Sequence, residues 1–427
     1  MMDFNSKEYK RSRVSYIIQS VFEYFLMILV SDAFLAKLLT HIGISDSVIG
    51  IISSFVNIAF VFQILSVFIV RMKIRQKPFL IFTYVCSFSA FMMMFLVPYL
   101  PVKNSAATVI VMMCVLLGYT LLYVVASIMF RWANSYVDPE RRGRFSSTRE
   151  IVSLLSGIAF SAVMGVIIDR YESLGNLQGG LLFIAVCILI FNVCNFICML
   201  LMKGETEETT EDSHITIKQT LNYVFENRSF KNVILMTILY ETARYFTIGF
   251  IGVFKTNDLA LSVLTIQVIN IMSNFVRMIL TRPLGKFSDK HSFAKGYRVG
   301  LSLLAAAFFI NIFTTSSTWY LIILHTVLYT GSLAGTNMNS FNITYSYVDS
   351  EYITQAMAIK NCVGGIFGFG ASLVAGKLLS VIQANGNIVF GIHIYGQQVL
   401  SIVSFILSAI TILFVKFVVE KQEVMKQ

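Results

Sequence analysis

Long apolar runs, each of about 20 residues or more, recur along the whole chain. A helix of that length crosses the hydrocarbon core of a bilayer, where only helices and closed barrels satisfy all their backbone hydrogen bonds. The pattern therefore predicts an all-α, polytopic membrane protein with twelve transmembrane helices. We place these helices at residues 16–40, 47–70, 78–99, 106–132, 145–168, 179–202, 231–254, 262–283, 297–315, 318–341, 354–381 and 394–418.

Basic residues are concentrated in alternate loops between these runs. The N-terminus and every second loop carry lysine and arginine, whereas the loops 41–47, 98–105 and 382–392 contain almost none. Cytoplasmic loops of membrane proteins carry such an excess of basic residues. We therefore predict a multi-pass protein of the cell membrane with both termini in the cytoplasm. The basic loop residues are Arg71, Lys73, Arg75 and Lys77, then Arg141, Arg142 and Arg144, then Lys286, Lys290, Lys295 and Arg298.

The composition agrees with a membrane protein and narrows the function. Of 427 residues, 56% are hydrophobic and 13% are charged, which is not a soluble globular composition. The net charge of +10 could indicate nucleic-acid binding, but the bases lie in short loops without the patterning of such a surface. The six cysteines all lie inside apolar runs without paired spacing, which argues against disulfides and a metal site. We expect no cofactor and no nucleic-acid partner.

The longest internal loop divides six predicted helices from six. We predict an N-terminal six-helix bundle at 1–203, a cytoplasmic linker at 204–230 and a C-terminal six-helix bundle at 231–427. The first part of the linker is acidic, and the second part spaces Ile217, Leu221, Val224 and Phe225 on one helical face. This spacing favours a short amphipathic helix on the membrane surface, with a solvated linker as the alternative.

The two halves contain an internal repeat. Residues Tyr136–Gly165 align with Tyr347–Gly376 without a gap. Because each half has an even number of helices, the halves have the same orientation and form a parallel repeat. The aligned identities are Tyr136/Tyr347, Val137/Val348, Asp138/Asp349, Glu140/Glu351, Gly157/Gly368, Ser161/Ser372, Val163/Val374 and Gly165/Gly376. Arg149 aligns with Lys360.

Small residues recur every four positions on the fifth and eleventh predicted helices. Such residues let two helix backbones approach closely within lipid. One interpretation is static packing, and the other is a sliding contact between moving halves. The residues are Ser153, Gly157, Ser161 and Gly165 on the fifth helix, and Gly364, Gly368, Ser372 and Gly376 on the eleventh.

Two loop segments are similar to those of the major facilitator superfamily. Gly285–Lys290 resembles the cytoplasmic loop signature that this family carries between its eighth and ninth helices, and Tyr136–Arg144 resembles its loop between the fourth and fifth. The first-half loop 71–77 lacks the family's Gly and Asp, and the fifth helix lacks the Gly-Pro pair of the drug–proton antiporters. The resemblance leaves the subfamily unassigned. Together with the repeat, it implies a cytoplasmic gate formed by Gly285, Asp289, Lys290, Arg144, Arg149 and Lys360, although Arg149 and Lys360 could equally be interfacial anchors.

Polar and ionisable residues inside the predicted helices are functional candidates, because burying them in a membrane is costly. The resemblance implies that helices 1, 4, 7 and 10 line a central cavity, and these helices carry the polar stripes. We predict that the cavity or substrate site is formed by Gln19, Glu23, Tyr119, Tyr123, Ser127, Tyr240, Glu241, Arg244, His325, Tyr329, Ser332, Thr336 and Asn339.

Purely structural roles remain open for individual polar residues of these helices. Glu241 and Arg244, three residues apart on one helical face, could be an internal neutralising pair. Arg131 lies near a helix end and could extend to the interface. His325 could be a hydrogen-bonded core histidine rather than a proton relay. Glu23 and Glu241 are the candidates for proton coupling, because a carboxylate can titrate when its access to water changes.

These observations together predict secondary active transport of a small solute by alternating access, with protons as a candidate coupling ion. We expect a monomer whose partners are membrane lipid and a small-molecule substrate. The alternatives are a channel, a non-transporting membrane sensor or, less favoured, a membrane enzyme, since no ATP-binding loop, metal cluster or nucleophile–base pair is present in the sequence. Drug efflux and sugar or metabolite uptake both fit the pattern, so substrate and direction stay open.

Overall fold

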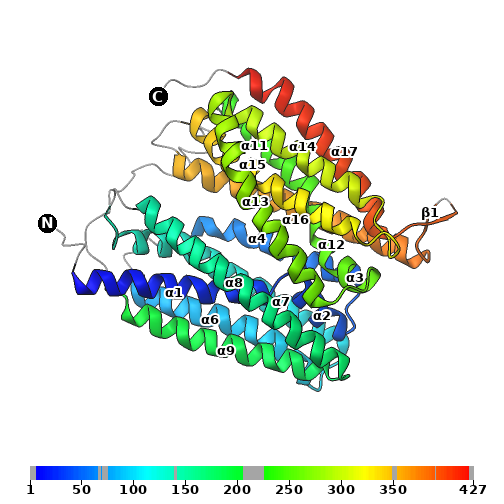
Figure 1. Cartoon of the computed structure of the whole chain (residues 1–427), viewed down its shortest axis with the longest axis horizontal. Coiled ribbons are helices and arrows are strands. Elements are labelled where there is room, and N and C mark those ends of the chain that lie inside the picture. The colour runs from blue at the N-terminus through cyan, green and yellow to red at the C-terminus, as the bar shows by residue number, and fades with distance from the viewer. Residues whose placement is uncertain are drawn as a thin grey trace. The chain divides into compact units, whose positions relative to one another are not determined.

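The structure, a computed structural model, describes residues 6–65, 69, 76–138, 142–204, 226–348, 353–389 and 391–422. Apart from one two-residue antiparallel ladder, the regular structure of this part is helical (Figure 1). The elements of the first half are α1 (Lys7–Leu29), α2 (Asp32–His41), α3 (Asp46–Ser53), α4 (Phe55–Val61), η1 (Phe62–Ile64), α6 (Gln76–Leu96), η2 (Val97–Tyr99), α7 (Asn104–Asn134), α8 (Arg142–Ser173) and α9 (Leu177–Leu201).

The second half follows the same order of long helices. Its elements are α11 (Arg228–Tyr245), α12 (Ile248–Val253), the π-helical turn η4 (Phe254–Asp258), α13 (Val263–Lys290), α14 (Phe293–Asn311), α15 (Leu321–Tyr347), α16 (Ile353–Ala384), β1 (Ile388–Val389), β2 (Ile392–His393), α17 (Gly396–Phe417) and η6 (Val419–Lys421). Most of the linker, residues 205–225, lies outside the described residues, so its predicted amphipathic helix stays a prediction.

Each predicted transmembrane segment coincides with a helix or a broken helix. Within the described ranges, nine helices are long and apolar enough to cross a membrane, and the bent pair α1–α2 brings the number to ten. The other two predicted segments are the shorter apolar helix pair at Asp46–Val61 and α15, which carries a polar stripe. The predicted twelve-helix, all-α architecture is confirmed.

The first transmembrane helix is broken near its end. The axes of α1 and α2 differ by 47°. At the break, the Ser31 hydroxyl donates to the carbonyl oxygen of Met27 at 2.7 Å, and Asp32 has a φ of 45°. A residue other than glycine rarely takes a positive φ, although aspartate does so more readily than most. The left-handed residue ends the helical run, so α2 begins in a new direction.

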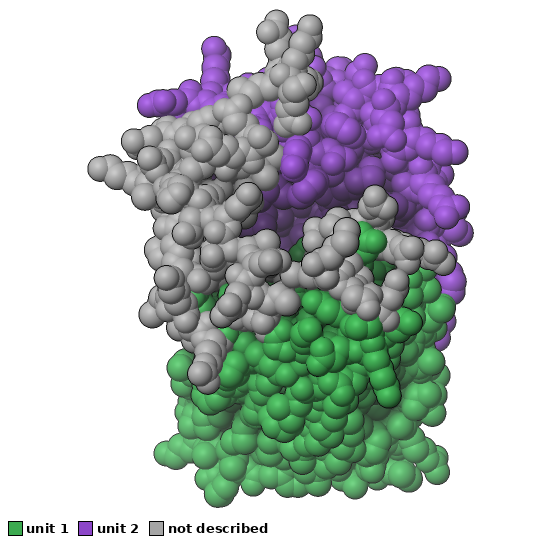
Figure 2. Space-filling model, turned by 90° about the vertical axis from the view of Figure 1, so that its left-hand side faces the viewer, with its two compact units in different colours: residues 1–45, 62–210, 262–267 green, residues 46–61, 211–261, 268–427 purple. Residues whose placement is uncertain are grey.

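The chain divides into two compact units (Figure 2). Unit 1 contains residues 1–45, 62–210 and 262–267, and unit 2 contains residues 46–61, 211–261 and 268–427. The short segment 46–61 therefore groups with the second half, and the first turn of α13 groups with the first. The bundle boundaries at residues 203 and 231 are drawn from the sequence, and they stay a prediction.

Glycines explain how α3 and α4 pack within unit 2. A Cβ atom on Gly365 of α16 would overlap the carbonyl oxygen of Asn57 on α4. One on Gly376 would lie 2.7 Å from the Ile51 side chain on α3. Backbones approach this closely only where no side chain intervenes.

The predicted small-residue stripes also lie against other helices. A Cβ atom on Gly364 would lie 3.0 Å from Thr237 on α11, and one on Gly165 of α8 would lie 2.9 Å from the Cα of Leu264. These contacts favour close packing as the role of the stripes. The sliding interpretation stays a prediction.

The tyrosines that open the sequence repeat occupy equivalent positions. The Tyr136 hydroxyl, just after α7, donates to the carbonyl oxygen of Lys203 at the end of the first half. The Tyr347 hydroxyl, at the end of α15, donates to the carbonyl oxygen of Val419, at 3.3 Å. Each tyrosine thus joins the fourth helix of its half to the end of the sixth.

Candidate functional site

The first candidate cluster surrounds Glu23 in unit 1. We call Tyr16, Gln19, Glu23, Tyr84 and Arg149 the Glu23 cluster. Oε2 of Glu23 accepts hydrogen bonds from Nε2 of Gln19 at 2.9 Å and from the Tyr84 hydroxyl at 3.3 Å. Gln19 and Glu23 meet because they lie four residues apart, on one face of α1. Tyr84 reaches the same carboxylate from α6.

Arg149 of α8 completes this cluster from another helix. Its Nη1 donates to the Tyr16 hydroxyl at 2.7 Å, and its guanidinium lies 5.7 Å from the centre of the Tyr16 ring. Burial of Tyr16 and its stacking on Phe145 hold the phenol in place. The fifth helix of the first half therefore brings a base to the carboxylate-bearing first helix, although Arg149 bonds Tyr16 rather than Glu23.

The second candidate cluster surrounds Glu241 in unit 2. We call Tyr240, Glu241, Arg244, Tyr329 and Lys360 the Glu241 cluster. Nη1 of Arg244 pairs with Oε2 of Glu241 at 3.3 Å, and both side chains are 21% exposed. Nε of Arg244 donates to the Tyr329 hydroxyl at 2.9 Å, and the Tyr240 hydroxyl shares a hydrogen bond with Thr336 at 3.2 Å. The predicted pair on α11 is therefore formed.

Lys360 of α16 brings a second base to this cluster. It is 4% exposed, and it lies close enough to attract the Glu241 carboxylate. Its ammonium donates to the Ser340 hydroxyl at 3.1 Å and to the Thr344 hydroxyl at 3.2 Å, both on α15. The repeat thus places a base from the fifth helix of each half, Arg149 or Lys360, near a carboxylate of the first.

The polar stripe of α15 divides between two neighbouring helices. Tyr329 and Thr336 reach α11, as described above. His325, which is 1% exposed, contacts the carbonyl oxygen of Ala307 on α14 through Nδ1 at 2.9 Å. Asn339 is fully buried beside Gly296 of α14, and its amide donates to its own helix. His325 therefore has the contacts of the hydrogen-bonded core histidine that the sequence left open. Ser332 is also fully buried and bonds its own helix.

The stripe of α7 is partly described. Tyr119 is buried, donates to the carbonyl oxygen of Val30 at 3.2 Å and stacks with Tyr123 at a ring separation of 6.4 Å. The side chains of Ser127 and Arg131 lie outside the described part of the structure.

The predicted gate residues lie on three helices, α8, α13 and α16. Asp289 and Lys290 are exposed at the end of α13, and neither side chain forms a hydrogen bond or ion pair with any residue in the described ranges. Gly285 lies near Met338. The Arg144 side chain is outside the described residues, and Arg149 and Lys360 belong to the clusters above. The gate stays a prediction.

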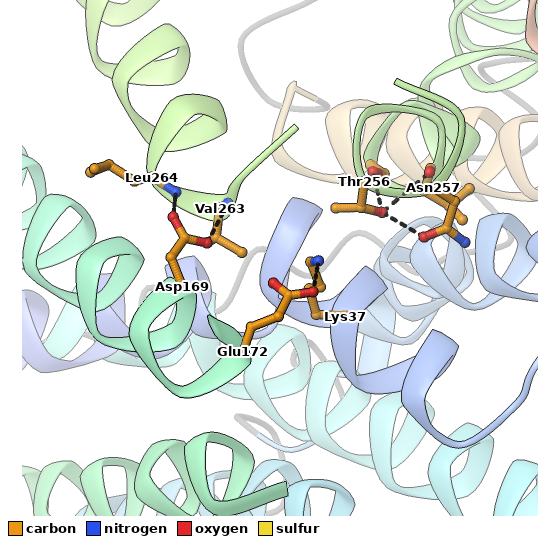
Figure 3. Close-up of polar contacts among 9 residues, drawn as sticks. Lys37, Asp169, Glu172, Thr256, Asn257, Val263 and Leu264 are labelled. Atoms are coloured by element: carbon orange, nitrogen blue, oxygen red, sulfur yellow. Dashed lines mark hydrogen bonds and ion pairs between the residues drawn. The ribbon is translucent and has the colours of Figure 1, made fainter. Parts of the chain in front are cut away.

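Sequence reasoning missed Asp169 of α8. Its two carboxylate oxygens accept hydrogen bonds from the backbone N–H groups of Val263, at 2.8 Å, and Leu264, at 2.9 Å (Figure 3). These are the first two residues of α13, whose N–H groups have no partner within the helix. One turn along α8, Glu172 pairs with Lys37 of α2 at 2.5 Å. The sequence feature that could have identified Asp169 is a carboxylate near the end of a long apolar helix.

We expect Asp169→Asn to lower the free energy of unfolding by about 1–2 kcal/mol, because the variant loses the charge that complements the helix N-terminus and weakens two charge-assisted hydrogen bonds. Thermal unfolding of the purified protein in detergent measures this. Glu172→Gln is the matched control, because it removes an exposed ion pair with an expected effect of about 0–1 kcal/mol. Equal stability of wild type and Asp169→Asn contradicts the role given to Asp169.

A family model and several solved structures match this chain. The family model described as Major Facilitator Superfamily matches residues 14–372. No curated protein matches the chain. Among solved structures, a mutant of the nucleoside transporter NupG superposes with a TM-score of 0.74 at 13% identity, covering 95% of this chain and 99% of that chain.

Two further structures show the same likeness. An auto-inhibited peptide transporter of the POT family gives a TM-score of 0.72 at 9% identity, covering 98% of each chain. A D-xylose–proton symporter gives 0.68 at 13% identity, covering 95% of this chain and 96% of that chain. At these identities the likeness concerns the fold alone.

Proposed function

Because this chain belongs to the Major Facilitator Superfamily, we propose that it is a secondary active transporter that moves a small solute by alternating access. The predicted membership of this family is thereby confirmed, and the chain is a multi-pass membrane transporter rather than an enzyme. The substrate, the coupling ion and the role of each residue are proposals.

One observation carries this proposal. Each half of the chain contains an ionisable carboxylate on its first helix, with a basic residue from its fifth helix nearby: Glu23 with Arg149, and Glu241 with Lys360. Static packing does not need ionisable groups within membrane-spanning helices, where each costs several kcal/mol unless it is paired or hydrated. Their repetition in both halves supports a functional role for each of the two clusters.

We assign proton coupling to these two carboxylates. Glu23 is held by two neutral donors, and Glu241 by a guanidinium at 3.3 Å. A charge-assisted hydrogen bond is normally shorter, about 2.7–2.9 Å. The side chains of Glu23 and Glu241 are both half-buried rather than fully buried. A change in water access can therefore protonate either carboxylate without breaking a strong ion pair.

Counterflow in proteoliposomes tests the transporter mechanism. A carrier loaded with unlabelled substrate transiently concentrates labelled substrate, and the rate saturates with concentration. A channel gives no such overshoot, and a sensor gives no flux. Uptake that rises linearly with concentration and lacks an overshoot contradicts alternating access.

We expect both termini to face the cytoplasm, because basic residues are concentrated in the N-terminal segment and the alternate loops. Single cysteines at Ser6 and Lys426, introduced where native cysteines are blocked or removed, are therefore labelled by an impermeant maleimide only after the cells are opened. A cysteine in the base-poor loop, at Ser105, is the control and is labelled in intact cells. Labelling of Ser6→Cys or Lys426→Cys from outside contradicts the orientation.

A further inference from the structure

We propose that the Glu241 cluster recognises a small organic carboxylate, whose carboxylate group binds the guanidinium of Arg244. This inference rests on the proposed transport function and names the class of its substrate. It depends on three features of the cluster: the unpaired N–H donors of Arg244, the excess of one positive charge, and the long contact between Glu241 and Arg244.

Arg244 is held in position but is incompletely paired. Arginine has five N–H donors, and two are used: Nε on the Tyr329 hydroxyl, and Nη1 on Glu241. The remaining donors, on Nη2 and the second Nη1 hydrogen, have no partner among the residues that the structure describes. These donors form the fork that binds a planar carboxylate through two parallel hydrogen bonds.

Aromatic rings surround the guanidinium of Arg244. The guanidinium carbon lies 4.7 Å from the centre of the Tyr245 ring and 5.9 Å from that of Tyr240. Tyr329 holds Nε from a third side. The rings restrain the guanidinium and offer apolar surface. The Arg244 side chain as a whole is 21% exposed, and its nitrogens are not among the buried atoms that lack a partner, so we infer that a small molecule can reach the unpaired donors.

The cluster has one more positive than negative formal charge. Arg244 and Lys360 are basic, and Glu241 is the acidic member. Lys360 donates to neutral oxygens of Ser340 and Thr344 and forms no ion pair shorter than 4.0 Å in the described part of the chain. An unbalanced charge in a membrane-spanning region is costly, so an incoming anion is favoured over a neutral or cationic solute.

Glu241 competes with the ligand for Arg244. Its contact of 3.3 Å is longer than a normal charge-assisted hydrogen bond. A carboxylate that binds the fork therefore gains most when Glu241 is neutral. This makes Glu241→Gln a sensitive test: it should tighten carboxylate binding, whereas a purely structural role for the pair predicts weaker binding or none.

Thermal shift of the full-length protein in detergent tests the ligand class. The probes are acetate, lactate, benzoate and phenylacetate, each compared with its own primary amide. Ligand that binds the folded state raises the unfolding midpoint. We expect at least one acid to raise it and the matching amide not to. Arg244→Gln should weaken binding of that acid about tenfold or more, and Arg244→Lys, which keeps the charge but not the fork, should weaken it less.

Controls separate recognition from misfolding. Arg282→Gln changes an exposed arginine of α13 outside the cluster, and it should keep the full shift. Each variant is first checked by its own unfolding midpoint and size-exclusion profile, and Glu241→Gln provides a gain of binding that a misfolded protein cannot show. The proposal is overturned if no acid stabilises the wild type, if acid and amide act equally, or if the shift survives in Arg244→Gln.

Failure of the ligand class and failure of the transport function have different signatures. If the class is wrong, a neutral or cationic solute shows counterflow that Arg244→Gln does not change. If transport itself is wrong, no solute shows counterflow, whatever binds in the thermal-shift assay.

Discussion

Glu241→Gln is expected to abolish the accumulation of substrate driven by a pH gradient while leaving substrate exchange partly intact. Accumulation requires a group that binds a proton on one side of the membrane and releases it on the other, and glutamine cannot titrate. Exchange needs only the loaded carrier to reorient. Because Gln has nearly the same shape as protonated Glu, the variant resembles one protonation state permanently. Glu23→Gln should behave in the same way.

The measurement uses proteoliposomes with an imposed pH gradient and the solute that gives counterflow with the wild type. A pH-sensitive dye inside the vesicles reports the accompanying proton flux. Glu172→Gln, which removes an exposed carboxylate paired with Lys37, is the control and should accumulate solute normally. If Glu23→Gln and Glu241→Gln both accumulate solute like the wild type, protons are not coupled through these carboxylates.

Gly365→Ala is expected to destabilise the protein by about 1–3 kcal/mol, the usual range for an overpacked core. The added Cβ would overlap the backbone carbonyl oxygen of Asn57 on α4. A flexible side chain could rotate away, but a helix backbone must shift as a whole. The expected effect therefore lies toward the upper end of this range, with separation of α4 from α16 as its structural consequence.

Gly370→Ala, on the same helix, is the matched control. A Cβ at Gly370 meets nothing within 4 Å, and alanine is favoured over glycine in a helix by about 1 kcal/mol. This substitution should therefore be neutral or stabilising. Thermal unfolding of the purified variants compares the two. Equal midpoints for Gly365→Ala and Gly370→Ala would mean that the close approach of α4 and α16 contributes nothing to stability.

The small residues show where sequence reasoning stopped. The spacing of Gly364 and Gly368 predicts a close helix contact, and both lie against α11. Nothing in the sequence separates Gly365, which lies against α4, from Gly370, where an added Cβ would meet nothing within 4 Å. Periodicity identifies a face of a helix, but not the helix that the face meets.

The candidate site shows the same division. The sequence identifies Glu23, Glu241 and Arg244, because an ionisable residue inside an apolar run is conspicuous whatever surrounds it. It also offers the contact of Glu241 with Arg244 as one interpretation, since the pair lies within one turn of one helix. Gln19 and Glu23 are likewise four residues apart on α1, and the structure joins them by a hydrogen bond. It does not predict Tyr84 beside Glu23 or Tyr329 beside Arg244.

Local properties were therefore decided by the sequence: the twelve spanning segments, the repeat that begins at Tyr136 and Tyr347, and the place of each charge along its helix. An apolar run that is long enough to span the bilayer forms a helix whatever the rest of the chain does, because its backbone hydrogen bonds must be satisfied within the segment. Tertiary structure alone decided the partners: Asp169 on the first turn of α13, His325 on Ala307, and Tyr329 on Arg244. Lipid satisfies every apolar helix face almost equally, so side-chain fit between helices distant in sequence selects which faces meet.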